Sequence, residues 1–220
     1  MTQQTRALRS AVLAAVAGSV DTFGYLALDR VFISHMTGNT AVLAIAIVQR
    51  NFGEAFHRGL AIPAFMAGSL AGAALVDNAE STRQVAHALL LEAALLAGVA
   101  VLSWSGAIDR QSCGAGCMLL LVLLASAVGI QNAALTHPGT RGTHTTHITG
   151  PLTDFAVEIV RTAEPDRQAE TRPGRLLGLA VRLLGFFGGG VAGALLFQVA
   201  PMTAPLIPAA VLVGLVWVGA

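Results

Sequence analysis

Two short segments combine a histidine with a Thr-Gly pair, and this combination could bind a small polar solute or carry protons. The first is His35-Met36-Thr37-Gly38-Asn39 and the second is His147-Ile148-Thr149-Gly150-Pro151. An imidazole gains and loses a proton close to neutral pH. Free backbone amides at the start of a helix favour an anion or a carboxylate. The two histidines are therefore candidate proton carriers, and the two Thr-Gly pairs are the candidate solute site.

Further polar residues near these segments extend the candidate site. Asp21 lies deep within an apolar stretch, and Gln131 with Asn132 occupies the corresponding place before the second segment. A carboxylate that faces carboxamides would form a polar centre inside a membrane, and a hydrogen bond that merely orders the bundle is the alternative. Asp154 is a further candidate for proton coupling, beside Asp21, His35 and His147. The candidate solute-binding residues are Asp21, Ser34, His35, Thr37, Gly38, Asn39, Gln131, Asn132, Thr146, His147, Thr149 and Gly150.

Other ionisable residues receive a structural interpretation. Glu92 and Arg182 lie within separate apolar stretches, and a structural ion pair between them would avoid burying either charge alone. His137 and His144 share a connection with His147, but no Cys or carboxylate completes a metal-binding spacing, so we expect no metal and no cofactor. Phosphate-binding loops, HExxH and GxSxG are absent from the sequence, so we do not expect an enzyme. An intramembrane enzyme that uses the histidines with Asp154 is the alternative.

The composition is that of an integral membrane protein. Hydrophobic residues make up 55% of the 220 residues and charged residues 11%, whereas a soluble domain is roughly 25% charged. The mean hydropathy is +0.69. A net charge of +1 argues against a nucleic-acid partner, which requires a basic surface. The expected partners are the lipid bilayer and a small polar or anionic solute.

The apolar stretches predict an all-α fold with six regular transmembrane helices and two broken segments. The regular helices are expected at 8–28, 59–76, 85–104, 116–136, 176–200 and 203–219. The broken segments, 31–48 and 145–160, should contain extended backbone and then a short helix with Thr37 or Thr149 as N-cap. Pro151 fits the first or second turn. Non-helical backbone inside a bilayer must be buried or face water, so the two segments should face each other.

The motifs occur twice in the same order. Gly18-Ser19-Val20-Asp21 matches Gly129-Ile130-Gln131-Asn132, and Phe65 with 68–73 matches Phe186 with 189–194. This pattern predicts two fused repeats, 1–110 and 111–220, that together form one membrane domain. Arginine placement with a cytoplasmic N-terminus favours eight crossings and a parallel repeat over an inverted one. The glycine-rich runs indicate close helix packing, with a homodimer interface as the alternative.

Two of these motifs carry a resemblance to a known family. Gly18-x-x-Asp21-x-x-Gly24-x-Leu26 and the run from Val31 to Asn39, Val-Phe-Ile-Ser-His-Met-Thr-Gly-Asn, resemble the YoaK-type uncharacterised family of bacterial multi-pass membrane proteins. Gly129-Ile130-Gln131-Asn132 and Thr149-Gly150 fit the same pattern, and the resemblance covers nearly the whole chain. It implies a bacterial inner-membrane location, without a substrate or a reaction. The chain departs from a glycine-rich consensus around Leu28-Asp29-Arg30, which affects the first connection.

Internal repeats, interrupted segments at matching places and ionisable residues in apolar stretches are together typical of secondary transporters. We therefore expect a small-solute transporter that is coupled to protons and has its site at the two Thr-Gly segments. A channel-like pore for a small anion or neutral solute and a non-transporting membrane scaffold are the alternatives.

Overall fold

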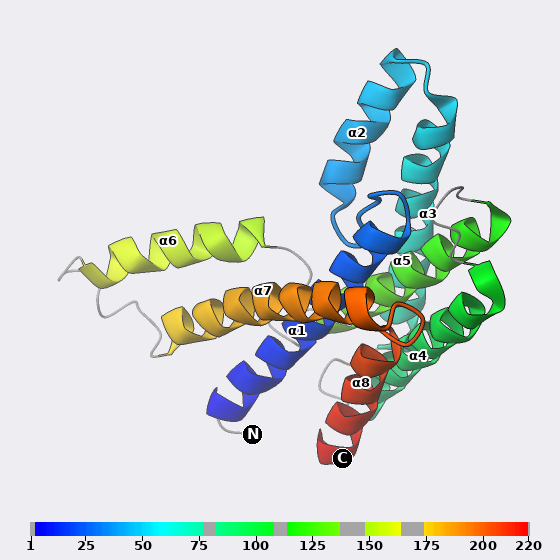
Figure 1. The fold of residues 1–220 in the computed structure, drawn as a ribbon. Coiled ribbons are helices and arrows are strands. Elements are labelled where there is room, and N and C mark those ends of the chain that lie inside the picture. Colours follow the sequence, from blue (N-terminus) through cyan, green and yellow to red (C-terminus); the bar gives the residue numbers. More distant parts are fainter. Residues whose placement is uncertain (1–2, 77–81, 108–113, 137–147, 164–173, 220) are drawn as a thin grey trace.

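The computed structural model describes residues 3–76, 82–107, 114–136, 148–163 and 174–219, and these residues are helical apart from the connections. Figure 1 shows the arrangement of the helices. Their bounds are α1 (Gln3–Ala27), α2 (Met36–Val48), α3 (Phe52–Leu75), α4 (Thr82–Leu102), a π-helical turn η1 (Ser103–Ala107), α5 (Ala115–Thr136), α6 (Thr149–Ala163), α7 (Arg175–Val199) and α8 (Leu206–Gly219). The all-α prediction is confirmed for the described residues.

Five helices are long and apolar enough to cross a membrane, namely α1, α3, α4 with the start of η1, α5 and α7. These helices coincide with five of the six predicted regular spans. The sixth, predicted at 203–219, is shorter, because turns occupy residues 201–205 and α8 has 14 residues. At a rise of about 1.5 Å per residue, α8 is about 20 Å long, which is less than the bilayer core of about 30 Å.

The interruption predicted before the first Thr-Gly pair is present, but the predicted N-caps are wrong. Residues 28–35 are non-helical, and α2 then begins at Met36 with His35 as its N-cap residue and no side-chain cap. Thr37 lies exposed in the first turn, and Thr149 is already the first residue of α6. The position of Pro151 in the first turn of α6 agrees with the prediction.

Two helix pairs have glycine at their contacts, α1 with α7 and α3 with α5. A Cβ added at any of these glycines would collide with the backbone of the facing helix, so the helices approach more closely than side chains would allow. The facing residues are Gly189 with Ala15 and Gly193 with Ser19 in the first pair, and Gly68 with Ser126 and Gly72 with Ile130 in the second. Since the residue numbers rise together, both pairs are parallel.

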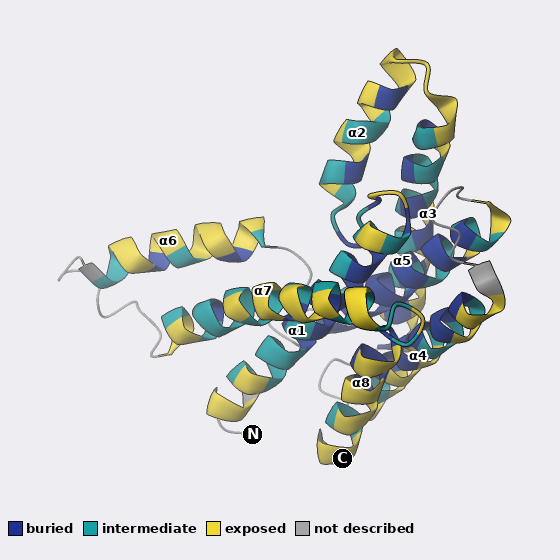
Figure 2. Ribbon diagram, viewed as in Figure 1, coloured by how far each residue is buried: buried dark blue, intermediate teal, exposed yellow. Residues whose placement is uncertain are grey.

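The remaining helices complete a bundle around this centre. α4 packs against α5 and α8, α2 packs against α3, and α6 packs against α7. In Figure 1, α1 and α7 run in one general direction, whereas α3 and α5 run in the opposite one. Figure 2 shows that burial is concentrated on α1, α4 and α5. The outer faces of α3, α7 and α8 expose large apolar side chains, as helices in contact with lipid do.

The structure does not bring α2 and α6 against each other. Each forms a hairpin with the helix that follows it, and the two hairpins extend in different directions from the centre (Figure 1). α2 packs against α3 rather than α6 because a short turn joins α2 to α3, and in this turn Arg50 has a left-handed φ of 58°. The expectation that the two Thr-Gly helices face one another is therefore wrong for their described residues.

Candidate functional site

The site is located where α1 stops and the chain turns towards α2. Asp29 and Arg30 have φ values of 49° and 59°, in the left-handed region that disfavours residues other than glycine. This geometry ends the helix and turns the chain back along it. Two non-glycine residues adopt this strained conformation, so the surrounding contacts must hold it.

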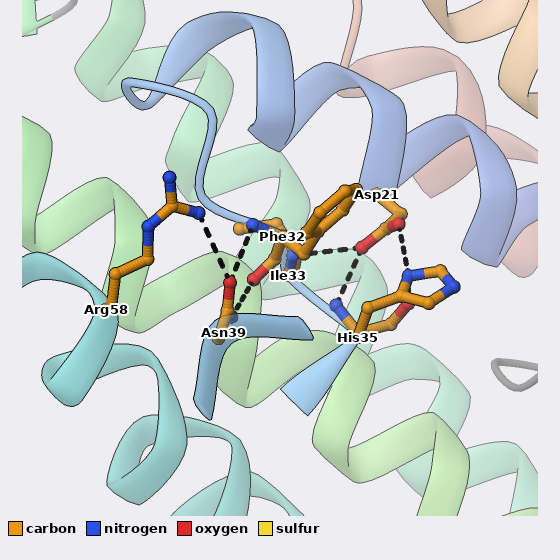
Figure 3. A network of polar contacts seen from close by, with 7 residues as sticks. Asp21, Phe32, Ile33, His35, Asn39 and Arg58 are labelled. Atoms are coloured by element: carbon orange, nitrogen blue, oxygen red, sulfur yellow. Dashed lines mark hydrogen bonds and ion pairs between the residues drawn. The ribbon is translucent and has the colours of Figure 1, made fainter. Parts of the chain in front are cut away.

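Asp21 supplies the first of these contacts. One carboxylate oxygen, Oδ1, accepts hydrogen bonds from the backbone N–H groups of Ile33 at 2.9 Å and Ser34 at 2.7 Å. The other, Oδ2, lies 2.8 Å from Nδ1 of His35. Figure 3 shows the carboxylate between α1 and the non-helical segment that leads to α2. Asp21 thus satisfies backbone donors that a membrane interior would otherwise leave unpaired.

Gly24 allows the extended segment to reach Asp21. It lies one turn further along α1, and a Cβ there would collide with the side chain of Ile33. Ile33 is fully buried and belongs to the main hydrophobic core. The pattern Gly18-x-x-Asp21-x-x-Gly24 therefore has a distinct purpose at each position, because Gly18 faces the backbone of Phe186 on α7.

His35 is the part of the site that remains accessible. Its side chain is 35% exposed, whereas that of Asp21 is 6% exposed. Nδ1 is occupied by Asp21 and by the hydroxyl of Ser34 at 3.2 Å. Among the described residues, none is hydrogen-bonded to Nε2. The ring packs against Phe32 and edge-on against Phe186, with centroid distances of 5.3 and 5.9 Å.

An imidazole oriented in this way can bind and release a proton. When Nδ1 donates to a carboxylate, the tautomer and the ring orientation are fixed, and the lone pair of Nε2 points away from the acid. The Asp21 carboxylate then stabilises the imidazolium that forms when Nε2 takes up a proton. The same Nε2 can exchange a hydrogen bond with a small polar solute.

Asn39 forms a second contact that holds the segment. Its Oδ1 accepts a hydrogen bond from the backbone N–H of Phe32 at 3.2 Å, and its Nδ2 donates to the carbonyl of Phe32 at 2.6 Å. Arg58 of α3 extends this contact by donating to the carbonyl oxygen of Arg30 and, at 3.5 Å, to Asn39 Oδ1. Figure 3 shows Asn39 and Arg58 on the opposite side of the segment from His35.

Both Asn39 and Arg58 are buried. Arg58 also lies 3.4 Å from Glu54, one turn earlier in α3. These contacts assign Asn39 mainly to holding the backbone, whereas the sequence placed it in solute binding. Sequence reasoning missed Arg58 and Phe32. An arginine just inside an apolar helix was the available signal for Arg58.

The second copy does not repeat this constellation within the described residues. Gln131 is buried and donates from Nε2 to the carbonyl of Leu13 at 2.9 Å. Leu13 precedes Asp21 by two turns of α1, so Gln131 ties α5 to α1 away from the carboxylate. Thr149 and Gly150 are exposed on α6. Thr146 and His147 lie outside the described residues, as do His137 and His144.

The second hairpin carries charges where the first is apolar. Arg175 on α7 lies 3.5 Å from Glu158 on α6, and the Glu158 side chain is 2% exposed. Asp154, about one turn before Glu158 on α6, acts electrostatically on Arg182, which lies about two turns after Arg175 on α7. In the sequence match, Glu158 takes the place of Ala46, which is fully buried.

The predicted ion pair between Glu92 and Arg182 is wrong. Within the described parts of the chain, neither carboxylate oxygen of Glu92 has a hydrogen-bond partner, and Arg182 donates from Nε to the carbonyl of Gly178 at 3.1 Å. Glu92 lies on α4, which packs against α5 and α8, whereas Arg182 lies on α7, which packs against α1 and α6. The two charged residues therefore lie on helices that have different packing partners.

A pocket of about 560 Å³ lies between the N-terminal ends of α1 and α7, away from Asp21. Its lining is apolar apart from one glutamine side chain. The lining residues are Gln4, Ala7, Leu8, Ala11, Gly174, Leu177 and Val181. No group of three or more potential metal ligands occurs within the described parts of the chain.

Comparison with known proteins shows the family of the chain and one similar transmembrane protein. The model of the family "Protein of unknown function (DUF1275)" matches residues 10–218. The chain belongs to this family. It is also similar to the UPF0700 transmembrane protein YoaK of Bacillus subtilis (strain 168), with 33% identity over 151 residues. The match covers 67% of this chain and 64% of YoaK. No solved structure matches the chain.

Membership of the DUF1275 family confirms the resemblance read from Gly18-x-x-Asp21 and the first Thr-Gly segment. The family model spans both the described site and the second half of the chain. The similarity to a transmembrane protein and the five long apolar helices together indicate a membrane protein in contact with the bilayer.

Proposed function

We propose that this protein transports a small solute across the bacterial inner membrane and that transport is coupled to protons through Asp21 and His35. In this proposal the N-terminus lies in the cytoplasm and the protein is built from two related halves. The observation that carries the proposal is a polar helix break in which an accessible imidazole is held by a buried carboxylate. Broken helices with ionisable residues at the break are the usual place for substrate and ion sites in secondary transporters.

The glycine contacts support the two related halves. Gly18 faces the backbone of Phe186, and Gly129 faces that of Phe65. In the sequence match, Gly18 corresponds to Gly129 and Phe65 to Phe186, so each contact is the counterpart of the other. The same holds for the pair Ala15 and Gly189 and the pair Ser126 and Gly68. A rotation that exchanges the halves would place α1 on α5 and α7 on α3.

The direction of the helices bears on the symmetry. α1 and α5 are the matched helices, and they run in opposite directions in Figure 1. Opposed matched helices favour the inverted arrangement over the parallel one that arginine placement favours. In this arrangement the rotation axis lies in the membrane plane, and a site at the junction of the halves can open to either side.

The two halves differ in the polar contacts that hold their hairpins together. Asp21 has Asn132 as its counterpart, while Ala46 has Glu158. The first hairpin is held by Arg58 and Asn39, and the second by the ion pair of Glu158 with Arg175. We infer that these differences let one hairpin move relative to the other during a transport cycle between two conformations.

The proposal is tested in liposomes that contain the purified protein and a trapped pH-sensitive dye. A panel of acetate, phosphate, uracil and neutral polyols is added from outside, with solute entry followed by light scattering and proton entry by the dye. We expect at least one solute to enter in a saturable way, together with protons. His35→Ala and Asp21→Asn should remove the proton entry, while Asp29→Asn, which changes an exposed acid nearby, should not.

Other outcomes distinguish the alternatives. Entry that does not saturate and does not move protons would indicate a channel-like pore. A protein that moves none of the panel and co-purifies with one specific partner would instead be a membrane scaffold. Proton entry that is unchanged in both His35→Ala and Asp21→Asn would refute the coupling mechanism.

A further inference from the structure

Glu92 is an acid that the proposed mechanism does not use. It lies in the middle of α4, its side chain is fully buried, and neither of its oxygens has a hydrogen-bond partner in the described part of the chain. The residues on either side of it on the same helix face, Leu89 and Leu96, are buried in the main hydrophobic core. Buried polar atoms are almost always hydrogen-bonded in folded proteins, so this carboxyl group requires an explanation.

The helices around Glu92 offer it no charge partner. α5 and α8, which pack against α4, contain no Asp, Glu, His, Lys or Arg. On α4 itself, Arg83 and His87 lie nearer the N-terminus and are exposed. The ionisable residues of α3 are Glu54, His57 and Arg58, and they lie in its first turns, beside α2. Asp21 and His35 bind each other at the end of α1.

An ionised carboxylate in this environment would be an uncompensated charge. At the centre of a membrane helix such a charge carries a large free-energy cost. A protonated carboxyl group avoids most of this cost. A Ca²⁺-like cation would need several oxygen ligands, and α5 and α8 offer no second acid to provide them.

We propose that Glu92 is a proton-binding site inside the membrane, separate from the site at Asp21 and His35. In the conformation described, it holds a proton as a neutral carboxylic acid. The site belongs to the first half only, because α8, the last helix of the second half, has no acid. Its role in the transport cycle rests on the proposed function, but its proton occupancy does not.

The test uses a hydrophobic carbodiimide on the full-length protein in detergent and in liposomes. The O–H of a neutral carboxylic acid adds across one C=N bond of dicyclohexylcarbodiimide to give an O-acylisourea. Transfer of the acyl group from oxygen to nitrogen then gives a stable N-acylurea, with no leaving group. Mass spectrometry of the α4 peptide should show this adduct at Glu92.

Two controls make the result specific. A water-soluble carbodiimide should not modify Glu92, because the group is buried, and the hydrophobic reagent should leave the solvent-accessible Glu54 unmodified. In the infrared spectrum, Glu92→Gln should remove a carbonyl band of a protonated carboxylic acid, whereas Glu54→Gln should not. The amide of Glu92→Gln replaces a neutral acid of the same shape, so this variant should retain its melting temperature.

The inference is overturned if Glu92 forms no adduct and Glu92→Gln removes no such band, since the group would then be ionised and paired. Neither readout needs a substrate, so this failure is distinct from failure of the transport proposal. If the protein transports a solute, Glu92→Gln should also change the number of protons that enter with each solute molecule. An unchanged number would restrict Glu92 to a static proton site.

Discussion

Replacement of Asp21 by alanine should destabilise the protein strongly. The change removes the acceptor of the Ile33 and Ser34 amides and the partner of His35. Each buried donor left without a partner costs about 1–3 kcal/mol, and a bond to a charged group contributes about 1.5–3 kcal/mol. His35 is partly exposed, so water replaces part of its bond. We therefore expect a loss of about 2–5 kcal/mol in the free energy of unfolding.

Asparagine at the same position separates geometry from charge. Its Oδ1 can still accept from both backbone amides, so Asp21→Asn should lose only about 1–2 kcal/mol, from the contact with His35. The assay is equilibrium unfolding in mixed micelles, monitored by circular dichroism while denaturing detergent is added. Asp29→Asn is the matched control, because this acid is exposed on the same connection and should change stability by less than about 0.5 kcal/mol.

The order of the variants is the decisive result. The structure predicts that alanine is worse than asparagine at position 21 and that the control is close to the wild type. If Asp21→Ala unfolds within about 0.5 kcal/mol of the wild type, the two backbone amides do not depend on the carboxylate. The assignment of Asp21 as the residue that holds the break would then be refuted.

Three further predictions concern contacts elsewhere in the fold. Gly68→Ala and Gly189→Ala should each lower the free energy of unfolding by about 1–3 kcal/mol, because the added methyl group meets the backbone of the facing helix. Gly98→Ala is the control, since its methyl group meets nothing within 4 Å and the change should be neutral or stabilising; thermal unfolding of the three variants checks this. Asn39→Ala should cost about 1–3 kcal/mol through the two bonds to Phe32, and unfolding measurements check this. The loss should exceed that of Asn51→Ala, since Asn51 is the exposed N-cap of α3 and accepts one bond, from the N–H of Glu54. Arg175→Gln should destabilise the protein by about 1–3 kcal/mol, because it leaves the Glu158 carboxylate buried without a charge partner. Adding Glu158→Gln should restore part of this loss, and equal stability of the single and double variants would exclude the ion pair.

The sequence was sufficient for the elements whose signals are local. Apolar length alone located five of the long helices, because a span requires about 20 consecutive apolar residues. The helix break before Met36 was also predictable, since polar and β-branched residues interrupt the apolar pattern there. Asp21 and His35 were recognised as candidates because ionisable residues are rare inside membranes.

What failed depended on contacts between distant residues. The pairing of Glu92 with Arg182 was inferred from charge alone, and the sequence does not state which helices are neighbours. Thr37 was expected to cap α2, but Asp21 and Asn39 already hold the backbone before it, so the hydroxyl is not needed. Arg58 was overlooked because its acceptor is a backbone carbonyl, which leaves no mark in the sequence.

The parallel contact of α1 with α7 has a consequence for biosynthesis. α1 leaves the ribosome long before α7, its glycine-bearing partner, has been translated. Until then, the surface of α1 that packs against α7 is in contact with lipid or with an insertion chaperone. The native bundle can therefore assemble only when almost the entire polypeptide is in the bilayer. Messages truncated before the seventh helix should consequently yield products that cellular proteases remove, however well their individual segments insert.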